Sequence, residues 1–110
     1  MPGISYKSVL RLQPMIFHAL VLDKKDNVAT AIRQLENGNS VSVRIEDSTT
    51  EIVVLETIPF GHKFALRDIQ HGELVIKYGE PIGRTTTKIR KSEHVHIHNV
   101  EGLKGRGDKL

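Results

Sequence analysis

A repeat with a spacing of twenty residues constrains the fold of this 110-residue chain more than any other feature of its sequence. In each copy an isoleucine precedes a short polar turn, a glutamate and an apolar segment. The matching positions are Ile69 and Ile89, Gly72 and Ser92, Glu73 and Glu93, and Val75 and Val95. Glycine and serine are both suited to turns, so each copy indicates a tight turn that leads into a strand. The repeat therefore predicts two similar β-units packed around a pseudo-twofold axis.

Three apolar patterns before the repeat predict further strands. Residues 16–22 form a short, nearly continuous apolar run, which is typical of a strand buried on both faces. His18 interrupts this run, and we expect it to be a buried, hydrogen-bonded structural histidine. Residues 41–45 alternate strictly between apolar and polar side chains, and residues 51–56 form another apolar segment. The polar segment 46–50 between them is therefore expected to be a hairpin loop.

One segment has the pattern of a helix. Residues 28–35 place apolar side chains at positions i, i+3, i+4 and i+7, which is the apolar stripe of an amphipathic helix. Asp26 is a suitable N-cap and Gly38 a suitable C-terminal stop. We therefore expect a mainly β fold with one helix (α+β), whose apolar face packs against the sheet.

Composition indicates one ordinary globular domain and excludes several kinds of site. Charged residues make up 26% of the chain and apolar residues 38%. We expect an N-terminal lead-in over residues 1–14, one domain over residues 15–101, and a flexible tail or linker over residues 102–110. The chain contains no cysteine, which excludes disulfides, thiolate metal sites and cysteine nucleophiles.

Charge and targeting signals narrow the choice of partners. The formal net charge is +3, but the sequence lacks a dense basic face interleaved with aromatic residues. Small anionic substrates are therefore favoured over nucleic acid. The apolar runs are far shorter than the ~20 residues of a membrane span, and the N-terminus carries no secretory signal. We expect a cytoplasmic protein that contacts no membrane.

Histidines at alternate positions form the clearest candidate metal ligands. His94, His96 and His98 project from one face if their segment is a strand, with neighbours ~6.6 Å apart and the outer two ~13 Å apart. Two adjacent imidazoles can therefore hold one ion, but all three cannot. A complete site needs another ligand, such as His62, a carboxylate or a group from a different chain. The half-exposed polar face of an edge strand explains the same pattern equally well.

Lysine and tyrosine side chains stand at two predicted turns. His62 and Lys63 follow Gly61 directly after a Pro/Gly turn, and Lys77 and Tyr78 precede Gly79. Such groups can bind a carboxylate or transfer protons near neutral pH. A polar surface turn is the alternative explanation for each pair.

The order and spacing of these motifs resemble a known family. The segments GHKFALRDI (61–69), GE (72–73), VIKYG (75–79), IG (82–83) and HVHIHN (94–99) closely resemble the N-terminal domain of altronate and galactarate dehydratases. The resemblance implies a SAF-type domain with a β-clip fold, a bent β-rich ribbon folded on itself. It also implies a lyase that removes water from sugar acids with a divalent metal, iron or manganese. The large catalytic portion lies outside this sequence, so the chain is expected to be a separate small subunit or an excised N-terminal domain.

The resemblance also implies roles for individual residues. Those expected to contribute are His62 and His96 in catalysis; Lys63, Lys77, Tyr78 and Asn99 in substrate binding; and His96 and His98 as metal contacts. Two positions depart from the family pattern. Residues 85–88 replace an alanine-containing segment that ends in aspartate, and Ser92 replaces the glycine of the second turn. These departures leave the substrate subgroup open.

Three functions follow from the resemblance. The first is the small subunit of a sugar-acid dehydratase, which binds the substrate carboxylate, pairs with a large catalytic subunit and is inactive or nearly so alone. The second is the small subunit of a sulfolactate sulfo-lyase, where sulfite departs instead of water. The third is a non-enzymatic SAF-like module that binds a carbohydrate or a protein. A homo-oligomer is compatible with all three.

Overall fold

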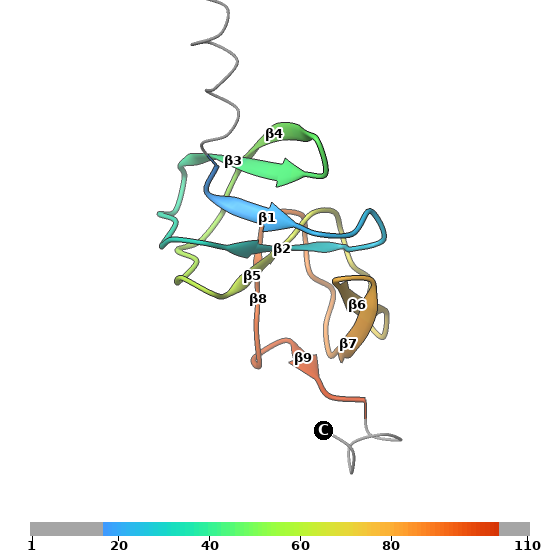
Figure 1. Cartoon of the computed structure of the whole chain (residues 1–110). Coiled ribbons are helices and arrows are strands. Elements are labelled where there is room, and N and C mark those ends of the chain that lie inside the picture. The colour runs from blue at the N-terminus through green and yellow to red at the C-terminus, as the bar shows by residue number, and fades with distance from the viewer. Residues whose placement is uncertain (1–16, 104–110) are drawn as a thin grey trace, which may run out of the picture.

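The computed structural model describes residues 17–103, and every regular element in that range is a β-strand (Figure 1). The strands are β1 (Ala19–Val21), β2 (Val28–Ala31), β3 (Ser40–Ile45), β4 (Ser48–Val53), β5 (Lys63–Ala65), β6 (Leu74–Lys77), β7 (Glu80–Thr85), β8 (His94–Val95) and β9 (Val100–Glu101). Among these residues no helix exists that could cross a membrane. The predicted lead-in 1–14 and most of the predicted tail 102–110 lie outside the described residues.

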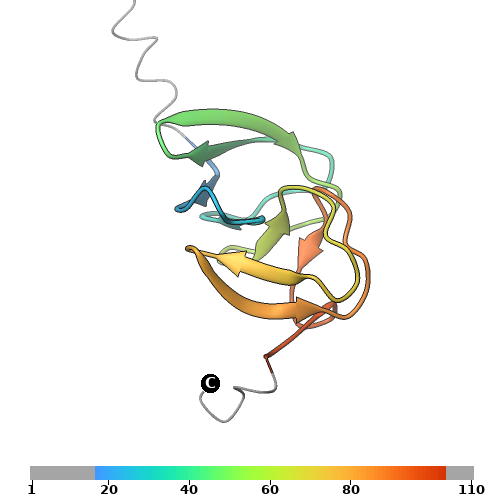
Figure 2. The ribbon, with the colours of Figure 1, turned by 90° about the vertical axis from the view of Figure 1, so that its right-hand side faces the viewer.

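The strands form two sheets. The larger sheet has the order β4-β3-β1-β2-β5-β8, and the smaller has the order β6-β7-β9. Only β1 and β3 pair in parallel; the other paired strands are antiparallel. Figure 2 shows the β3–β4 and β6–β7 hairpins at opposite ends of the domain, with the short strands between them. The predicted hairpin is confirmed, but its bounds differ. Its second strand is Ser48–Val53 instead of 51–56, and its turn is only Glu46 and Asp47 instead of 46–50.

The predicted helix over residues 28–35 is wrong, because residues 28–31 form strand β2. This strand lies between β1 and β5 and is covered on both faces. Val28 packs into one apolar cluster, whereas Ala29 and Ala31 pack into the other. Apolar residues on both faces of a central strand imitate a helical stripe over so short a segment. Ile32, the remaining member of the stripe besides Leu35, is 38% exposed.

The predicted pseudo-twofold relation of the twenty-residue repeat is confirmed. Ile69 and Ile89 form an antiparallel bridge in which each N–H donates to the other carbonyl, at 2.7 and 2.8 Å. Both isoleucines are fully buried, as are Val75 and Val95. Each glutamate accepts a bond at its Oε1 from the backbone N–H three residues earlier, at 2.9 Å for Glu73 and 2.8 Å for Glu93. The two copies therefore build one apolar cluster from equivalent positions.

The same turn occurs twice more in the described residues, as a second interlocked pair. Leu35 and Ile58 form the equivalent bridge, with both hydrogen bonds at 2.8 Å. In all four copies the residue three positions later has a positive φ, and its N–H donates to the segment that precedes the partner copy; these residues are Gly38, Gly61, Gly72 and Ser92. The residues six positions after each bridge are buried: Val41, Phe64, Val75 and Val95. The domain is therefore assembled from two pseudo-twofold pairs.

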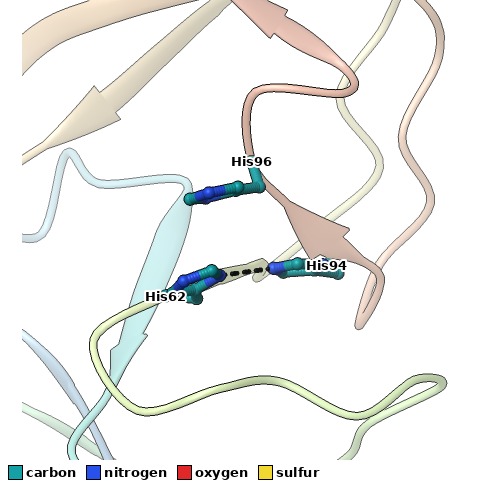
Figure 3. Close-up of side chains that lie close together, drawn as sticks. All are labelled: His62, His94 and His96. Carbon is teal, nitrogen blue, oxygen red and sulfur yellow. Dashed lines mark hydrogen bonds between the residues drawn. The ribbon is translucent and has the colours of Figure 1, made fainter.

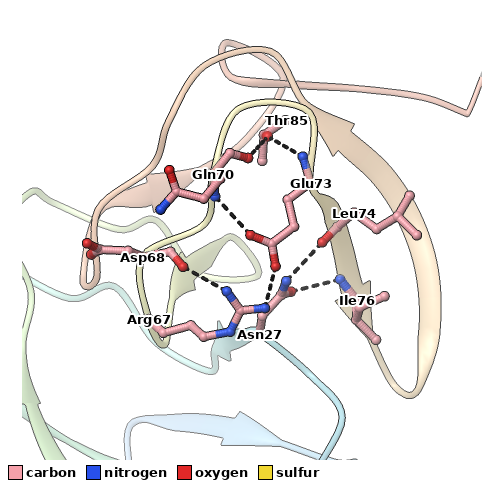
Figure 4. A network of polar contacts seen from close by, with 8 residues as sticks. All are labelled: Asn27, Arg67, Asp68, Gln70, Glu73, Leu74, Ile76 and Thr85. Atoms are coloured by element: carbon pink, nitrogen blue, oxygen red, sulfur yellow. Dashed lines mark hydrogen bonds and ion pairs between the residues drawn. The ribbon is translucent and has the colours of Figure 1, made fainter.

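Three side chains hold the strands that follow these turns. Asn27, which is 2% exposed, donates from Nδ2 to the Leu74 carbonyl at 2.9 Å and accepts from the Ile76 N–H at 2.8 Å (Figure 4). Asn99 makes the same pair of bonds to the next copy, with the His94 carbonyl and the His96 N–H, both at 2.9 Å.

His18 occupies the corresponding place in the Leu35–Ile58 pair, beside the strand that follows Leu35. Its Nδ1 accepts from the Ser42 N–H at 2.9 Å, and its own N–H donates to the Ser42 carbonyl at 2.8 Å. The side chain is half-buried. The expectation of a hydrogen-bonded structural histidine is therefore confirmed, and His18 joins β1 to β3.

Replacing Ser92 by glycine is expected to raise the free energy of unfolding by about 0.5–1 kcal/mol, because a non-glycine residue in the left-handed region is strained. Ser92 has a φ of 78°, and the three equivalent glycines have φ values of 87°, 84° and 83°. Urea unfolding of the two proteins measures the difference. Gly72→Ala is the matched control: its new Cβ has free space, so backbone strain alone should lower stability. A stabilising Gly72→Ala would contradict this account.

Candidate functional site

Three histidines meet where β5 and β8 pair. The register joins Lys63 to Val95 and Phe64 to His94, so the next position along places His62 opposite His96. Directly opposite side chains on antiparallel strands are close neighbours. The rings of His62 and His96 accordingly stack with centroids 3.9 Å apart, and His62 Nδ1 lies 2.9 Å from His94 Nε2 (Figure 3). Ligand nitrogens of all three lie within 4.8 Å of one another. We call His62, His94 and His96 the histidine cluster.

Backbone contacts fix each member of the histidine cluster. The His62 N–H donates to the Pro59 carbonyl at 3.0 Å, and its carbonyl accepts from the Ala31 N–H at 2.8 Å. The His94 N–H donates to Glu56 Oε2 at 3.0 Å. The Asn99 side chain bonds the same segment at two points, the His94 carbonyl and the His96 N–H. The three rings therefore stand on segments whose backbones are hydrogen-bonded on both sides.

The environment favours the neutral form of two cluster members. Burial, followed by the charges of His98 and His62, lowers the pKa of His94 below its ordinary value. Partial burial, followed by the charges of His62 and Lys63, also lowers the pKa of His96. Near neutral pH both imidazoles therefore offer a ring nitrogen lone pair for binding a proton or a metal ion.

Lys63 lines an open pocket of about 250 Å³ beside the histidine cluster. Its walls are Val75, Ile82, Val95, His96, Ile97, Val100, Glu101 and Gly102. His96 borders both the pocket and the cluster. Burial, followed by the charge of Lys77, lowers the pKa of the Lys63 ammonium. One cation, Lys63, therefore stands at a largely apolar pocket, with the charge of Lys77 near enough to act on it. A cation in such a setting can attract an organic anion.

Lys77 and Tyr78 lie at the end of the β6–β7 hairpin. Tyr78 and Gly79 form its two-residue turn, with φ values of 56° and 79°, as in a type I′ turn. The Lys77 ammonium lies 4.7 Å from the centroid of the Tyr78 ring. The Gly79 N–H donates to Asp26 Oδ1 at 2.8 Å, which ties the turn to the segment before β2. Tyr78 is 47% exposed, so its hydroxyl group is accessible to a ligand or another chain.

Two predicted site residues have positions that bear directly on their roles. Asn99 is 6% exposed and bonds the backbone of the histidine strand through both ends of its amide, which makes it a positioning residue in this structure. His98 is exposed and lies outside the histidine cluster, although its ring centroid is 5.2 Å from that of His94. The substrate role of Asn99 and the metal role of His98 remain predictions.

His94 is the member that the sequence analysis left without a role. The alternation of the three histidines placed it on the same face as His96, but nothing local distinguishes it from His98. The signal that does so is the β5–β8 register, which brings His62 beside His94 and His96 only.

The histidine cluster fits a transition metal in its donor chemistry. Imidazole suits zinc, copper, iron and nickel, whereas manganese prefers carboxylate and water ligands. The cluster contains no carboxylate, and the nearby Glu56 carboxylate already accepts from the His94 N–H. Of the two metals expected from the resemblance, iron therefore fits these residues better than manganese does.

Comparisons with known proteins agree with this architecture. The family model of the altronate/galactarate dehydratase SAF domain matches residues 17–103. The (2R)-sulfolactate sulfo-lyase subunit alpha of Chromohalobacter salexigens is 41% identical over 85 residues, which cover 74% of this chain and 90% of that subunit. The altronate dehydratase of Escherichia coli K12 is 44% identical over 89 residues, covering 81% of this chain but only 16% of that enzyme. The galactarate dehydratase (L-threo-forming) of the same Escherichia coli strain is 35% identical over 82 residues, and the chain covers 14% of that enzyme.

The fold and the site define a small all-β domain that offers imidazole and ammonium groups beside one open pocket. The match to the family model identifies the kind of domain. The chain belongs to the SAF-domain family of altronate and galactarate dehydratases. The resemblance inferred from the sequence motifs is therefore confirmed.

Proposed function

We propose that this chain is the SAF-domain subunit of a sugar-acid dehydratase and supplies part of an active site that a large catalytic subunit completes. One observation carries the proposal: Lys63 lines the same pocket as His96, which is a member of the histidine cluster. A sugar acid needs the same combination, a cation for its carboxylate and proton-transferring groups for its hydroxyl-bearing carbons. The β-clip arrangement expected for SAF domains is part of this proposal.

The reaction proposed for the assembled enzyme is β-elimination of water. A base removes the proton beside the carboxylate, and the hydroxyl group on the next carbon departs as water. Lys63 and Lys77 would bind the carboxylate, and the exposed Tyr78 hydroxyl would bond a substrate hydroxyl group. His62 or His96, both half-buried and hydrogen-bonded or stacked within the cluster, would accept or deliver a proton. A divalent metal bound in the assembled enzyme would polarise the departing hydroxyl group.

The site described here is open, which supports a partner that completes it. Two of the isoleucines that line the pocket are exposed, Ile97 by 84% and Ile82 by 39%. Exposed apolar side chains around a pocket are typical of a surface that another protein covers. In the dehydratase relatives the matched segment is a small part of a much longer chain. We propose that a large subunit supplies the corresponding remainder.

A second candidate function is the small subunit of a sulfo-lyase. The observation in its favour is length: the chain covers 90% of the Chromohalobacter salexigens sulfo-lyase subunit alpha and 88% of the Paracoccus pantotrophus one. The chemistry would use the same groups, with sulfite as the leaving group in place of water. Both candidates require a cation for the substrate carboxylate and an assembled complex.

The purified 110-residue chain is expected to show no turnover of either substrate class, because it lacks the large catalytic part. Mixed with the large subunit from its own genome, it should release a 2-keto-3-deoxy acid from altronate or galactarate, measured by a colour assay for that product. Sulfite release from (2R)-sulfolactate would instead establish the second function. Turnover by the chain alone would contradict the proposal. If neither mixture is active and no large subunit co-purifies, the non-enzymatic binding module is supported.

A further inference from the structure

The histidine cluster combines features that rarely meet by chance in one small sheet. His94 and His96 project from the same face at alternate positions, and the β5–β8 register brings His62 across to them. The three side chains come from two segments more than thirty residues apart, which only the fold joins. No lysine or arginine is hydrogen-bonded to any of them among the described contacts. What the cluster gathers is a set of three ring-nitrogen donors.

We propose that His62, His94 and His96 bind one divalent transition-metal ion, of the class of Fe²⁺, Co²⁺ and Zn²⁺, within this chain itself. Two nitrogens bound to one ion at ~2.1 Å in a tetrahedral arrangement lie roughly 3.4 Å apart. The observed His62–His94 nitrogen separation of 2.9 Å and the overall limit of 4.8 Å bracket that value. The backbone therefore already places the three donors at metal-binding distance.

The rings need only a rotation to take up an ion. Their planes are nearly parallel, at 19°, 13° and 10° to one another, so the in-plane lone pairs do not yet converge on one point. Histidine χ2 is a broad, roughly two-fold torsion, and turning these rings requires no movement of the strands. The bonds from Asn99 and Glu56 hold the backbone of His94 and His96 while the rings turn.

Three protein ligands leave at least one coordination position open, as in catalytic rather than structural metal sites. Because His96 also borders the pocket that Lys63 lines, an oxygen of a ligand in that pocket could occupy such a position. The identity of this oxygen as a substrate hydroxyl or carboxylate rests on the proposed function. Binding of the ion does not, since it needs only residues of this chain.

The test uses the complete chain, purified without a polyhistidine tag and stripped with a chelator. Titration with Co²⁺ is followed by visible absorption, and titration with Zn²⁺ by calorimetry. We expect one ion per chain, intense d–d bands of low-coordinate Co²⁺, and ¹⁵N shifts of the ring nitrogens of His62, His94 and His96 on Zn²⁺ binding. Failure to bind one equivalent with a dissociation constant below about 100 μM, near the weak end of specific metal sites, would overturn the proposal.

Single variants identify the ligands. His62→Ala is expected to weaken Co²⁺ binding roughly 100-fold or more and to abolish the d–d bands, because two remaining imidazoles no longer enclose the ion. His71→Ala, at an exposed turn position without a described contact to the cluster, should bind as the parent does. His98→Ala should change the affinity less than about threefold, which is under about 1 kcal/mol, because His98 lies outside the histidine cluster. A full loss in His98→Ala with unchanged binding in His62→Ala would overturn the assignment in favour of the pair His96 and His98.

Folding of each variant is checked separately by urea unfolding, and His62→Gln provides a second test that keeps the volume of the side chain. Both substitutions at position 62 should lose the Co²⁺ bands while the unfolding transition stays cooperative. Failure of the metal-site proposal can be distinguished from failure of the proposed function. Metal binding without lyase activity would support the metal site and reject the dehydratase role. Lyase activity without metal binding would support the dehydratase role and reject the metal site.

Discussion

Replacing Lys63 by methionine in the assembled enzyme is expected to lower kcat/KM for the acid substrate roughly 10²–10³-fold, because losing one partner of a partly buried charge pair costs 2–5 kcal/mol. Methionine retains the long apolar stem, which packs in a pocket lined by Val75 and Val95, so the shape of the site is preserved. The measured effect should therefore report the ammonium group itself. Steady-state kinetics with the sugar acid and with its sulfo-acid counterpart measure it.

Lys91→Met is the matched control for this prediction. Lys91 is exposed in the turn before β8, at the opposite end of that strand from His96, and loses the same charge. Its kinetics should stay within about threefold of the parent enzyme, since exposed charges contribute little when they contact no ligand. Equal losses in the two variants would show that net charge, rather than a contact at position 63, attracts the substrate.

Replacing Asn27 by alanine is expected to lower the free energy of unfolding by about 2–4 kcal/mol, because it leaves two part-buried backbone groups without their partners. These groups are the Leu74 carbonyl and the Ile76 N–H of β6. Asn27 is also the start of the link between the two sheets, since its own N–H donates to the Ile76 carbonyl at 3.2 Å. The variant should therefore open the β6–β7 hairpin before the larger sheet unfolds.

Urea unfolding gives the total effect, and hydrogen exchange of β6 and β7 amides locates it. Asn37→Ala, at an exposed turn position, serves as the control and should change stability by less than about 0.5 kcal/mol. An Asn27→Ala protein as stable as this control would contradict the role given to the side chain. Uniform loss of protection across both sheets would instead mean that they unfold as one unit.

The strongest predictions from the sequence came from features whose physical cause is local. The match between Ile69 and Ile89 and between their turns follows from the conformation that a tight turn requires, and the structure confirms it. The Val41–Ile45 alternation likewise predicted a strand that has one face in the core. Two further copies of the turn, at Leu35 and Ile58, carry a glycine three residues later, so the sequence encodes them in the same local way.

The wrong helix prediction arose where tertiary context overrides a short pattern. Residues 28–35 resemble a helix only because β2 is buried on both faces, which no window of eight residues can reveal. The positioning contacts of Asn99, whose amide bonds the backbone of His94 and His96, also depend on the fold, and its substrate role stays a prediction. The burial of β2 depends on its pairing with β5, and the contacts of Asn99 depend on the position of the His94–His96 segment. Neither arrangement is encoded in neighbouring residues.

The sequence by itself determined the residue types of the site, the repeated turns and the membership of the family, because each is encoded within a few consecutive residues. Only the tertiary structure decided which histidines meet. His94 and His98 are equivalent in the alternating pattern, and strand geometry alone allows either to pair with His96. The β5–β8 register selects His94, since it places His62 opposite His96 and within 2.9 Å of the His94 ring nitrogen. Strand register is a long-range property, set by burial on the sheet faces rather than by neighbours along the chain.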